Sequence, residues 1–105
     1  MACEVLEGVQ FQSADEIKVR TMDTSAITGN AAPGNPIVAA YDEDNNDADV
    51  TFAVFPSGSP TAGPGPVITC PALRNLVKGK TYRIEIRFTY GGNTYEPHYR
   101  VKCVY

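Results

Sequence analysis

Tryptophan is absent from the 105-residue chain, and His98 is its one histidine. No apolar run approaches the roughly 18 residues that cross a bilayer, so the sequence predicts no transmembrane helix. The first residues contain no base before the first apolar stretch, and Glu4 and Glu7 interrupt that stretch. This pattern is not that of a secretory signal peptide, and we expect the protein to be made in the cytoplasm without contact with a membrane.

Cysteine is scarce: Cys3, Cys70 and Cys103 are an odd number and lack the C-x-x-C spacing. In a cytoplasmic protein this predicts reduced thiols, and Cys70 with Cys103 is the pair to test for a disulfide, because both lie in predicted strands. A zinc site would require the thiols and His98 to converge. His98 and Cys103 are an odd number of positions apart on one strand, which places them on opposite faces. We therefore expect no zinc site, no thiol catalysis and no bound cofactor.

Catalytic motifs are also missing. Ser57 and Ser59 lie in a loop rich in proline and glycine, residues 57–66, rather than in a nucleophile elbow. No glycine-rich loop of the type that binds phosphate precedes a predicted helix. Paired carboxylates occur only in an exposed acidic run, where water leaves no carboxyl poised as an acid. We therefore expect that the protein is not an enzyme.

The clearest pattern lies at the end of the chain, residues 76–105, and predicts one antiparallel β-hairpin. On the first strand, Tyr82, Ile84, Ile86, Phe88 and Tyr90 alternate with Arg83, Glu85, Arg87 and Thr89. Residues 91–93, Gly-Gly-Asn, permit the positive φ that a tight turn demands. The return strand places on one face Tyr95, Pro97, Tyr99, Val101, Cys103 and Tyr105. Because side chains alternate across a strand, both strands present one buried face and one wet face.

Short apolar runs between turn-rich connections cover the rest of the chain and predict an all-β fold. The predicted strands are Val5–Gln12 with a bulge at Gly8, Glu16–Thr21 with Ile17 and Val19 on one face, Pro36–Tyr41, a partner strand with Val50, Phe52 and Val54, and Val67–Cys70. The predicted loops are residues 23–36, with a short helical turn near residues 23–26, and residues 57–66. With the C-terminal hairpin we expect about seven antiparallel strands in a single sandwich domain, residues 1–105, because a chain of this length builds one core.

The densest polar segment is the acidic run of residues 42–49. Oxygen ligands of the kind that calcium prefers are supplied by Asp42, Asp44, Asn46, Asp47 and Asp49. The start of the run matches the D-x-D-x-N of an EF-hand loop, but Asp47 replaces the required glycine and Ala53 the bidentate glutamate. The sequence therefore favours a solvated loop between two strands, with a weak calcium site as the alternative.

The two signs of charge are separated along the chain. Residues 1–50 contain ten acidic and two basic residues, whereas residues 74–102 contain seven basic and two acidic residues. Bases on one predicted sheet face form a candidate interface: Arg83, Arg87, Arg100 and Lys102. Nucleic-acid binding is not expected there, because the aromatic residues needed for stacking fall on the opposite parity. Two interpretations remain, namely pairing within one sandwich and docking between the acidic and basic ends of neighbouring copies.

Residues 76–82, Leu-Val-Lys-Gly-Lys-Thr-Tyr, resemble the L-x-P-G-x-x-Y segment of fibronectin type III and related immunoglobulin-like domains. Lys78 stands in place of the usual proline. The resemblance implies that Leu76 fills the core, that Gly79 permits a tight connection, and that the Tyr82 hydroxyl bonds to upstream backbone. It therefore implies an immunoglobulin-like β-sandwich, and the motif is a device of the fold rather than an active site.

The whole chain is also similar to the small immunoglobulin-like structural proteins of tailed bacteriophages and prophages. The likeness lies in its compact size, its lack of a signal peptide, its loop-rich first half and its closing strand with a G-G-N turn. It implies a non-enzymatic virion component of the head, neck or tail that contacts other virion proteins or copies of itself, as a homo-oligomer in the second case. The alternative is a binding or adhesion module that uses residues 42–49 or 57–66 to hold calcium, glycan or a protein partner.

Overall fold

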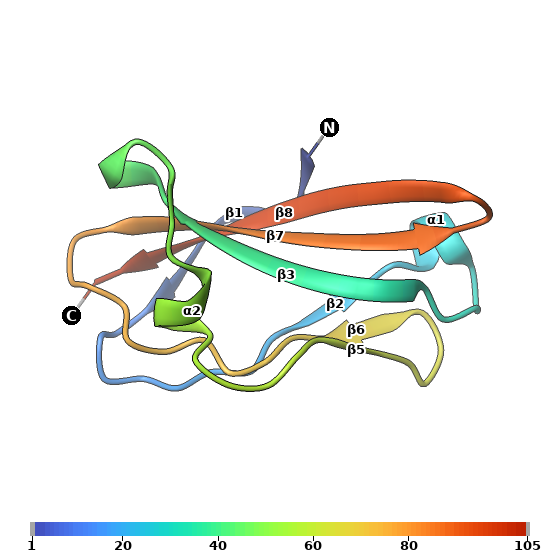
Figure 1. Cartoon of the computed structure of the whole chain (residues 1–105), viewed down its shortest axis with the longest axis horizontal. Helices are drawn as coiled ribbons and strands as arrows, with labels where there is room; N and C mark the ends of the chain where they lie inside the picture. The colour runs from blue at the N-terminus through green and yellow to red at the C-terminus, as the bar shows by residue number, and fades with distance from the viewer. Residues whose placement is uncertain (1, 105) are drawn as a thin grey trace.

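The computed structural model describes residues 2–104, with side chains described from residue 9 onward. The chain forms an all-β sandwich of two sheets, which confirms the predicted fold class (Figure 1). The five-stranded sheet has the order β1-β8-β7-β3-β4, and the three-stranded sheet has the order β2-β6-β5. The strands are β1 (Ala2–Gln12), β2 (Thr21–Asp23), β3 (Gly34–Asp42), β4 (Ala48–Asp49), β5 (Thr61–Ala62), β6 (Val67–Thr69), β7 (Thr81–Tyr90) and β8 (Asn93–Cys103).

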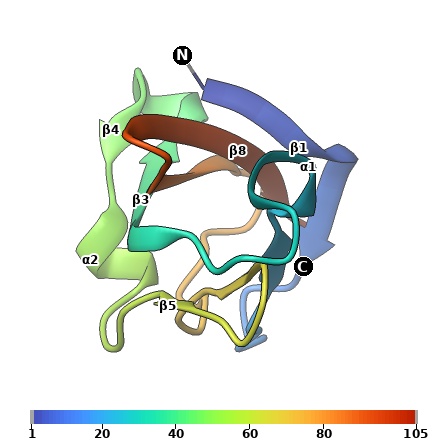
Figure 2. The same cartoon turned by 90° about the vertical axis from the view of Figure 1, so that its right-hand side faces the viewer.

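Three short helical elements lie in the connections: α1 (Ser25–Thr28), the 3-10 turn η1 (Glu43–Asn45) and α2 (Thr51–Val54). Figure 2 views the sandwich from its end, with β8 and β3 in one layer and β5 in the other. None of the helices in the described part of the chain is long and apolar enough to cross a bilayer.

The β7–β8 hairpin follows the predicted alternation. Buried side chains on the two strands are Tyr82, Ile84, Ile86, Phe88, Tyr99, Val101 and Cys103. Phe88 stacks on Tyr95 with ring centroids 5.5 Å apart, and the turn uses positive φ at Gly91 and Gly92. β3 pairs antiparallel with β7, an orientation that the sequence predicts, but β1 pairs parallel with β8, so this pair departs from the all-antiparallel arrangement expected from the sequence. The register of β1 shifts between Glu4 and Val9, the stretch in which Gly8 predicts a bulge.

The connection into β7 has the geometry that the L-x-x-G-x-x-Y spacing implies. Leu76 is buried in the core, and Gly79 adopts a φ of +88°, which residues with a side chain rarely do. The Val77 N–H donates to the Tyr82 hydroxyl over 2.8 Å. This hydrogen bond ties the connection to the first buried residue of the strand.

The predicted strand through Val50, Phe52 and Val54 is wrong, because residues 51–54 form helix α2. The Asp49 carboxylate accepts hydrogen bonds from the Thr51 N–H and hydroxyl, over 2.9 and 2.7 Å, and so starts the turn. The Val54 N–H then donates to the Val50 carbonyl. Residues four apart share a helix face just as residues two apart share a strand face, so the apolar pattern fits both. Phe52 consequently points outward and is 89% exposed.

Two other boundaries differ from the prediction. The loop at residues 57–66 contains the short strand β5, which pairs with β6 and brings the described strands to eight rather than about seven. Residues 16–20 form no regular strand, and their one bridge joins Lys18 to Leu73. Ile17 and Val19, which the sequence predicts on one face, are both exposed, while Arg20 is buried.

Candidate interaction edge

Residues 17–20 continue into β2, which forms one border of the three-stranded sheet. We call residues 17–23 the β2 edge. The Lys18 N–H donates to the Leu73 carbonyl over 3.1 Å, and the Leu73 N–H returns a hydrogen bond to Lys18 over 2.9 Å. The Cys70 N–H donates to the Arg20 carbonyl over 2.9 Å. Met22 pairs with Ile68 of β6. The even-numbered residues are thus bound to the neighbouring segment.

The odd-numbered residues of the β2 edge present their backbone outward. N–H and C=O groups of successive residues in an extended chain point to opposite sides, so those of Ile17, Val19, Thr21 and Asp23 face away from β6. Because β2 is terminal in its sheet, no strand within residues 2–104 pairs with that side. The edge is therefore open for backbone hydrogen bonding.

Side-chain burial along the edge reverses the usual preference. Ile17 and Val19 are 57% and 56% exposed, whereas Arg20 and Met22 are 9% and 4% exposed. Pairing with β6 sets this register, since a shift by one residue would move every side chain to the other face. It buries Met22 and lets the Thr24 hydroxyl donate to the Pro66 carbonyl over 2.7 Å. The consequence is two apolar side chains in water and a guanidinium inside.

Arg20 has an incomplete set of hydrogen bonds. Its Nη1 donates to Gln12 Oε1 over 2.7 Å, and Gln12 Nε2 in turn donates to the Leu73 and Glu16 carbonyls. Its Nη2 is buried without a hydrogen-bond partner among the described residues. Burial lowers the pKa of the guanidinium below its ordinary value. Arg20 is still a cation at neutral pH. The Glu16 carboxylate attracts it electrostatically, but no carboxylate in the described side chains forms an ion pair with it.

Cys70 and Tyr99 lie near Arg20 and are both neutral at physiological pH. Burial raises the pKa of the Cys70 thiol to about 11. Burial also raises the pKa of the Tyr99 hydroxyl above its ordinary value. Neither group therefore neutralises the guanidinium. Cys70 is a reduced thiol in this structure, so the disulfide to Cys103 is not formed.

The predicted acidic run lies against the late basic strands. Asp42 accepts from Lys80 Nζ over 2.6 Å. Glu43 Oε1 accepts from Nε and Nη2 of Arg100 over 3.0 and 2.8 Å. Arg83 Nη1 reaches Glu43 and also Asp47, over 3.4 and 3.2 Å. These ion pairs are the ones expected from pairing within one sandwich.

The other oxygens proposed for calcium are engaged locally. Asp44 accepts from the Thr81 N–H over 2.7 Å, and Asp49 accepts from Thr51. Asn46 and Asp47 both have positive φ, which turns the chain back toward β4. Among the side chains described, no group of three or more His, Cys, Asp or Glu residues is placed to hold a metal ion.

The remaining predicted site residues do not converge. Arg83 and Arg100 are held by the acidic run, while Arg87 and Lys102 are exposed and form no ion pair within the described side chains. Cys103 is fully buried, and His98 lies on the other face of β8, half-buried. Cys3 precedes the residues whose side chains are described.

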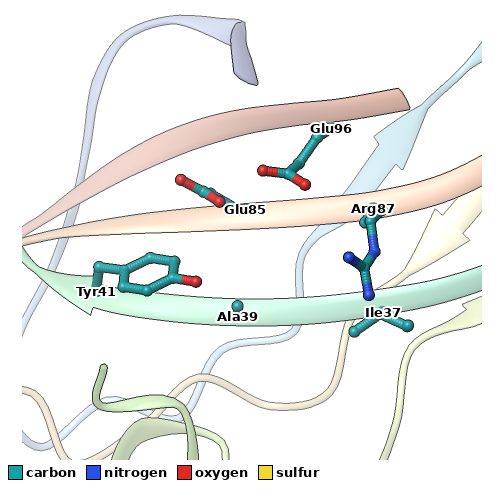
Figure 3. A pocket seen from close by; sticks show the side chains of 6 residues that line it. All are labelled: Ile37, Ala39, Tyr41, Glu85, Arg87 and Glu96. Carbon is teal, nitrogen blue, oxygen red and sulfur yellow. The ribbon is translucent and has the colours of Figure 1, made fainter. Parts of the chain in front are cut away.

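A shallow hollow of about 140 Å³ lies on the outer face of the five-stranded sheet (Figure 3). Its lining is Ile37, Ala39, Tyr41, Glu85, Arg87 and Glu96. Arg83 Nε donates to Glu85 over 2.8 Å, and the same guanidinium lies over the Tyr41 ring, 5.0 Å from its centroid. Partial burial, together with the Glu85 carboxylate, raises the pKa of Tyr41.

A second groove, of about 260 Å³, lies beside β3 and is bordered by Phe52, Phe55 and residues 58–60. Pockets that enclose small molecules usually measure about 300–1,000 Å³. The two depressions are smaller than that range.

No known protein family, curated protein or solved structure matches this chain. Functional inference therefore depends on the geometry of the β2 edge and on the chemistry of Arg20. Sequence patterns alone predicted neither feature. The one signal for them lies in the even-numbered residues of the segment 16–24, among which Met22 is the apolar residue.

Proposed function

We propose that this protein is a non-enzymatic structural protein that acts through protein–protein contacts as a component of a phage or prophage virion. The observation that carries the proposal is the β2 edge, with its outward backbone groups and the exposed side chains of Ile17 and Val19. An uncovered edge of this kind promotes aggregation of a monomer, whereas an assembly covers it.

The layout of the sandwich supports the immunoglobulin-like part of the proposal. One sheet contains β2, β6 and β5, and the other contains β3, β7 and β8. If the two-residue strand β4 is left out of the count, β2, β5 and β6 are the second, fourth and fifth strands, and β3, β7 and β8 are the third, sixth and seventh. Immunoglobulin-like sandwiches divide their strands between two sheets in the same way. The hydrogen bond from the Val77 N–H to the Tyr82 hydroxyl is a further point of likeness.

The edge also explains how such a domain would join an assembly. A partner strand laid beside residues 17–23 would form main-chain hydrogen bonds with four residues and cover two apolar side chains. The domain itself would not need to rearrange, because these groups already face solvent. Binding of this kind depends on backbone and surface, and it requires no catalytic group.

Substitution of the edge tests the proposal in particles released from cells that carry the gene. We expect mass spectrometry to find the chain in purified particles, and Val19→Lys to lower its incorporation because a charge would be buried at the contact. Val77→Lys is the matched control, since Val77 is 53% exposed on another loop. Absence of the wild-type chain from the particles would refute the virion role.

The alternative is a binding module that uses residues 57–66. A specific observation favours its protein-binding form: Gly58, Ser59 and Pro60 border the groove beside the exposed Phe52. Calcium binding is less favoured, because the carboxylates of residues 42–49 already accept hydrogen bonds within the domain. A rise of the melting temperature on addition of calcium would support that form, and we expect none.

A further inference from the structure

Arg20 and the open edge lie together on one side of the sandwich. β5 lies next to β3, so the opposite border of the small sheet, β2, lies on the side of β1 and β8. The hydrogen bond from Arg20 to Gln12, the last residue of β1, spans the two sheets at this side. Among the residues that the structure describes, both the buried Nη2 and the outward backbone groups of the edge lack hydrogen-bond partners, and they lie on the same side of the sandwich.

A strand added to the edge would bring one of its side chains to Arg20. Its hydrogen bonds would be made to Ile17, Val19 and Thr21, so the residue opposite Arg20 would occupy a non-hydrogen-bonded position. In an antiparallel ladder such a pair has Cα atoms about 4.5 Å apart, and the two side chains lie on the same face. The face shared with Arg20 is the inner one.

The partner position opposite Arg20 favours an acidic side chain. The Glu16 carboxylate attracts Arg20 electrostatically, but within the described side chains no carboxylate accepts a hydrogen bond from Nη2. A buried guanidinium group with an unmade hydrogen bond is costly, and a charged hydrogen bond to Nη2 would offset that cost. We propose that the β2 edge binds an extended segment of a partner protein that carries Asp or Glu opposite Arg20. This inference rests on the proposed function and names the chemistry of the partner.

A second copy bound through the same edge fits poorly. Suppose that two copies pair antiparallel through the outward backbone groups of their β2 edges. In one central register Arg20 of one copy then lies opposite Arg20 of the other, and in a neighbouring register it lies opposite Lys18. Like charges at directly opposed positions are destabilising. The partner segment is therefore expected to differ in sequence from residues 17–23.

Short synthetic peptides test the inference on the purified full-length chain. The probe is a peptide of alternating Thr and Val with one central Glu, compared with the same peptide carrying Gln or Lys at that position. We expect the Glu peptide to bind about tenfold more tightly than the Gln peptide by fluorescence anisotropy, because one charged hydrogen bond is gained. Amide hydrogen exchange should slow at Ile17, Val19 and Thr21.

Variants of Arg20 provide the control. Arg20→Gln should bind the Glu and Gln peptides equally while it still protects the edge amides, and Arg20→Met serves if the first variant does not fold. The comparison of the peptides on the wild-type chain requires no variant. Unchanged exchange at Ile17, Val19 and Thr21 with every peptide would refute strand addition. Protection without preference for Glu would refute the acidic partner alone, and neither result depends on whether the chain occurs in particles.

Discussion

Alkaline pH should destabilise the folded protein through Cys70. The thiol is 3% exposed, and its pKa rises from 9.0 to about 11 on folding because burial disfavours the thiolate. A raised folded pKa means that the folded state retains the proton longer than the unfolded state. The stability that depends on the neutral thiol is therefore complete below about pH 9 and is lost as the pH rises through about 11.

The size of the effect follows from the shift of the pKa. One pKa unit corresponds to about 1.4 kcal/mol, so the free energy of unfolding should fall by about 1 kcal/mol near pH 10 and by about 3 kcal/mol above pH 11. Tyr99 and Tyr82 also have raised pKa values and act in the same direction. Comparison with Cys70→Ala removes the contribution of Tyr82 and leaves that of Cys70 together with its interaction with Tyr99.

The assay is urea denaturation of the wild-type chain and of Cys70→Ala between about pH 8 and pH 10. Cys70→Ala has a fixed cost from the lost packing, and that cost does not vary with pH. We expect the difference in stability between the two proteins to shrink by about 1 kcal/mol over this range. An equal loss of stability in both proteins would refute the assignment of a buried, neutral thiol.

Two further substitutions test the fold and its ion pairs. Tyr82→Phe should lower the free energy of unfolding by about 1–2 kcal/mol, because the Val77 N–H loses its acceptor. Tyr90→Phe, at a more exposed tyrosine, is the matched control and should change little. Glu43→Gln should cost about 1 kcal/mol at low salt and less at high salt, since the paired Arg100 is partly exposed. A loss that does not depend on salt would contradict the ionic origin.

The C-terminal hairpin shows how far local pattern can be trusted. Its alternation was predicted correctly because both strands have one strongly apolar parity and a turn that requires glycine. Segments with weaker patterns were predicted less well. Val50 and Val54 fit a helix turn as well as a strand, and the Asp49 side chain decided between them by starting the turn at Thr51.

For the candidate edge, the sequence predicts that Ile17 and Val19 share a face, but it does not predict that this face is exposed. Residues 16–21 carry apolar side chains on one parity and bases on the other, so local pattern favours burial of Ile17 and Val19. Pairing with β6 instead buries Met22 and brings Arg20 inside with it. A short strand has one register, and the contacts of Met22 and Thr24 outweighed the two exposed residues.

Taken by itself, the sequence determined the class of the fold, the β7–β8 hairpin and the connection at Leu76–Tyr82, because these depend on residues close together in the chain. Only the tertiary structure decided which acids pair with which bases, whether residues 51–54 are helix or strand, and which face of residues 17–23 is buried. Each of these depends on partners from distant parts of the chain, as Lys80 does for Asp42. Local periodicity contains no information about such partners, so the open edge and the buried Arg20 appear only when the sheets are assembled.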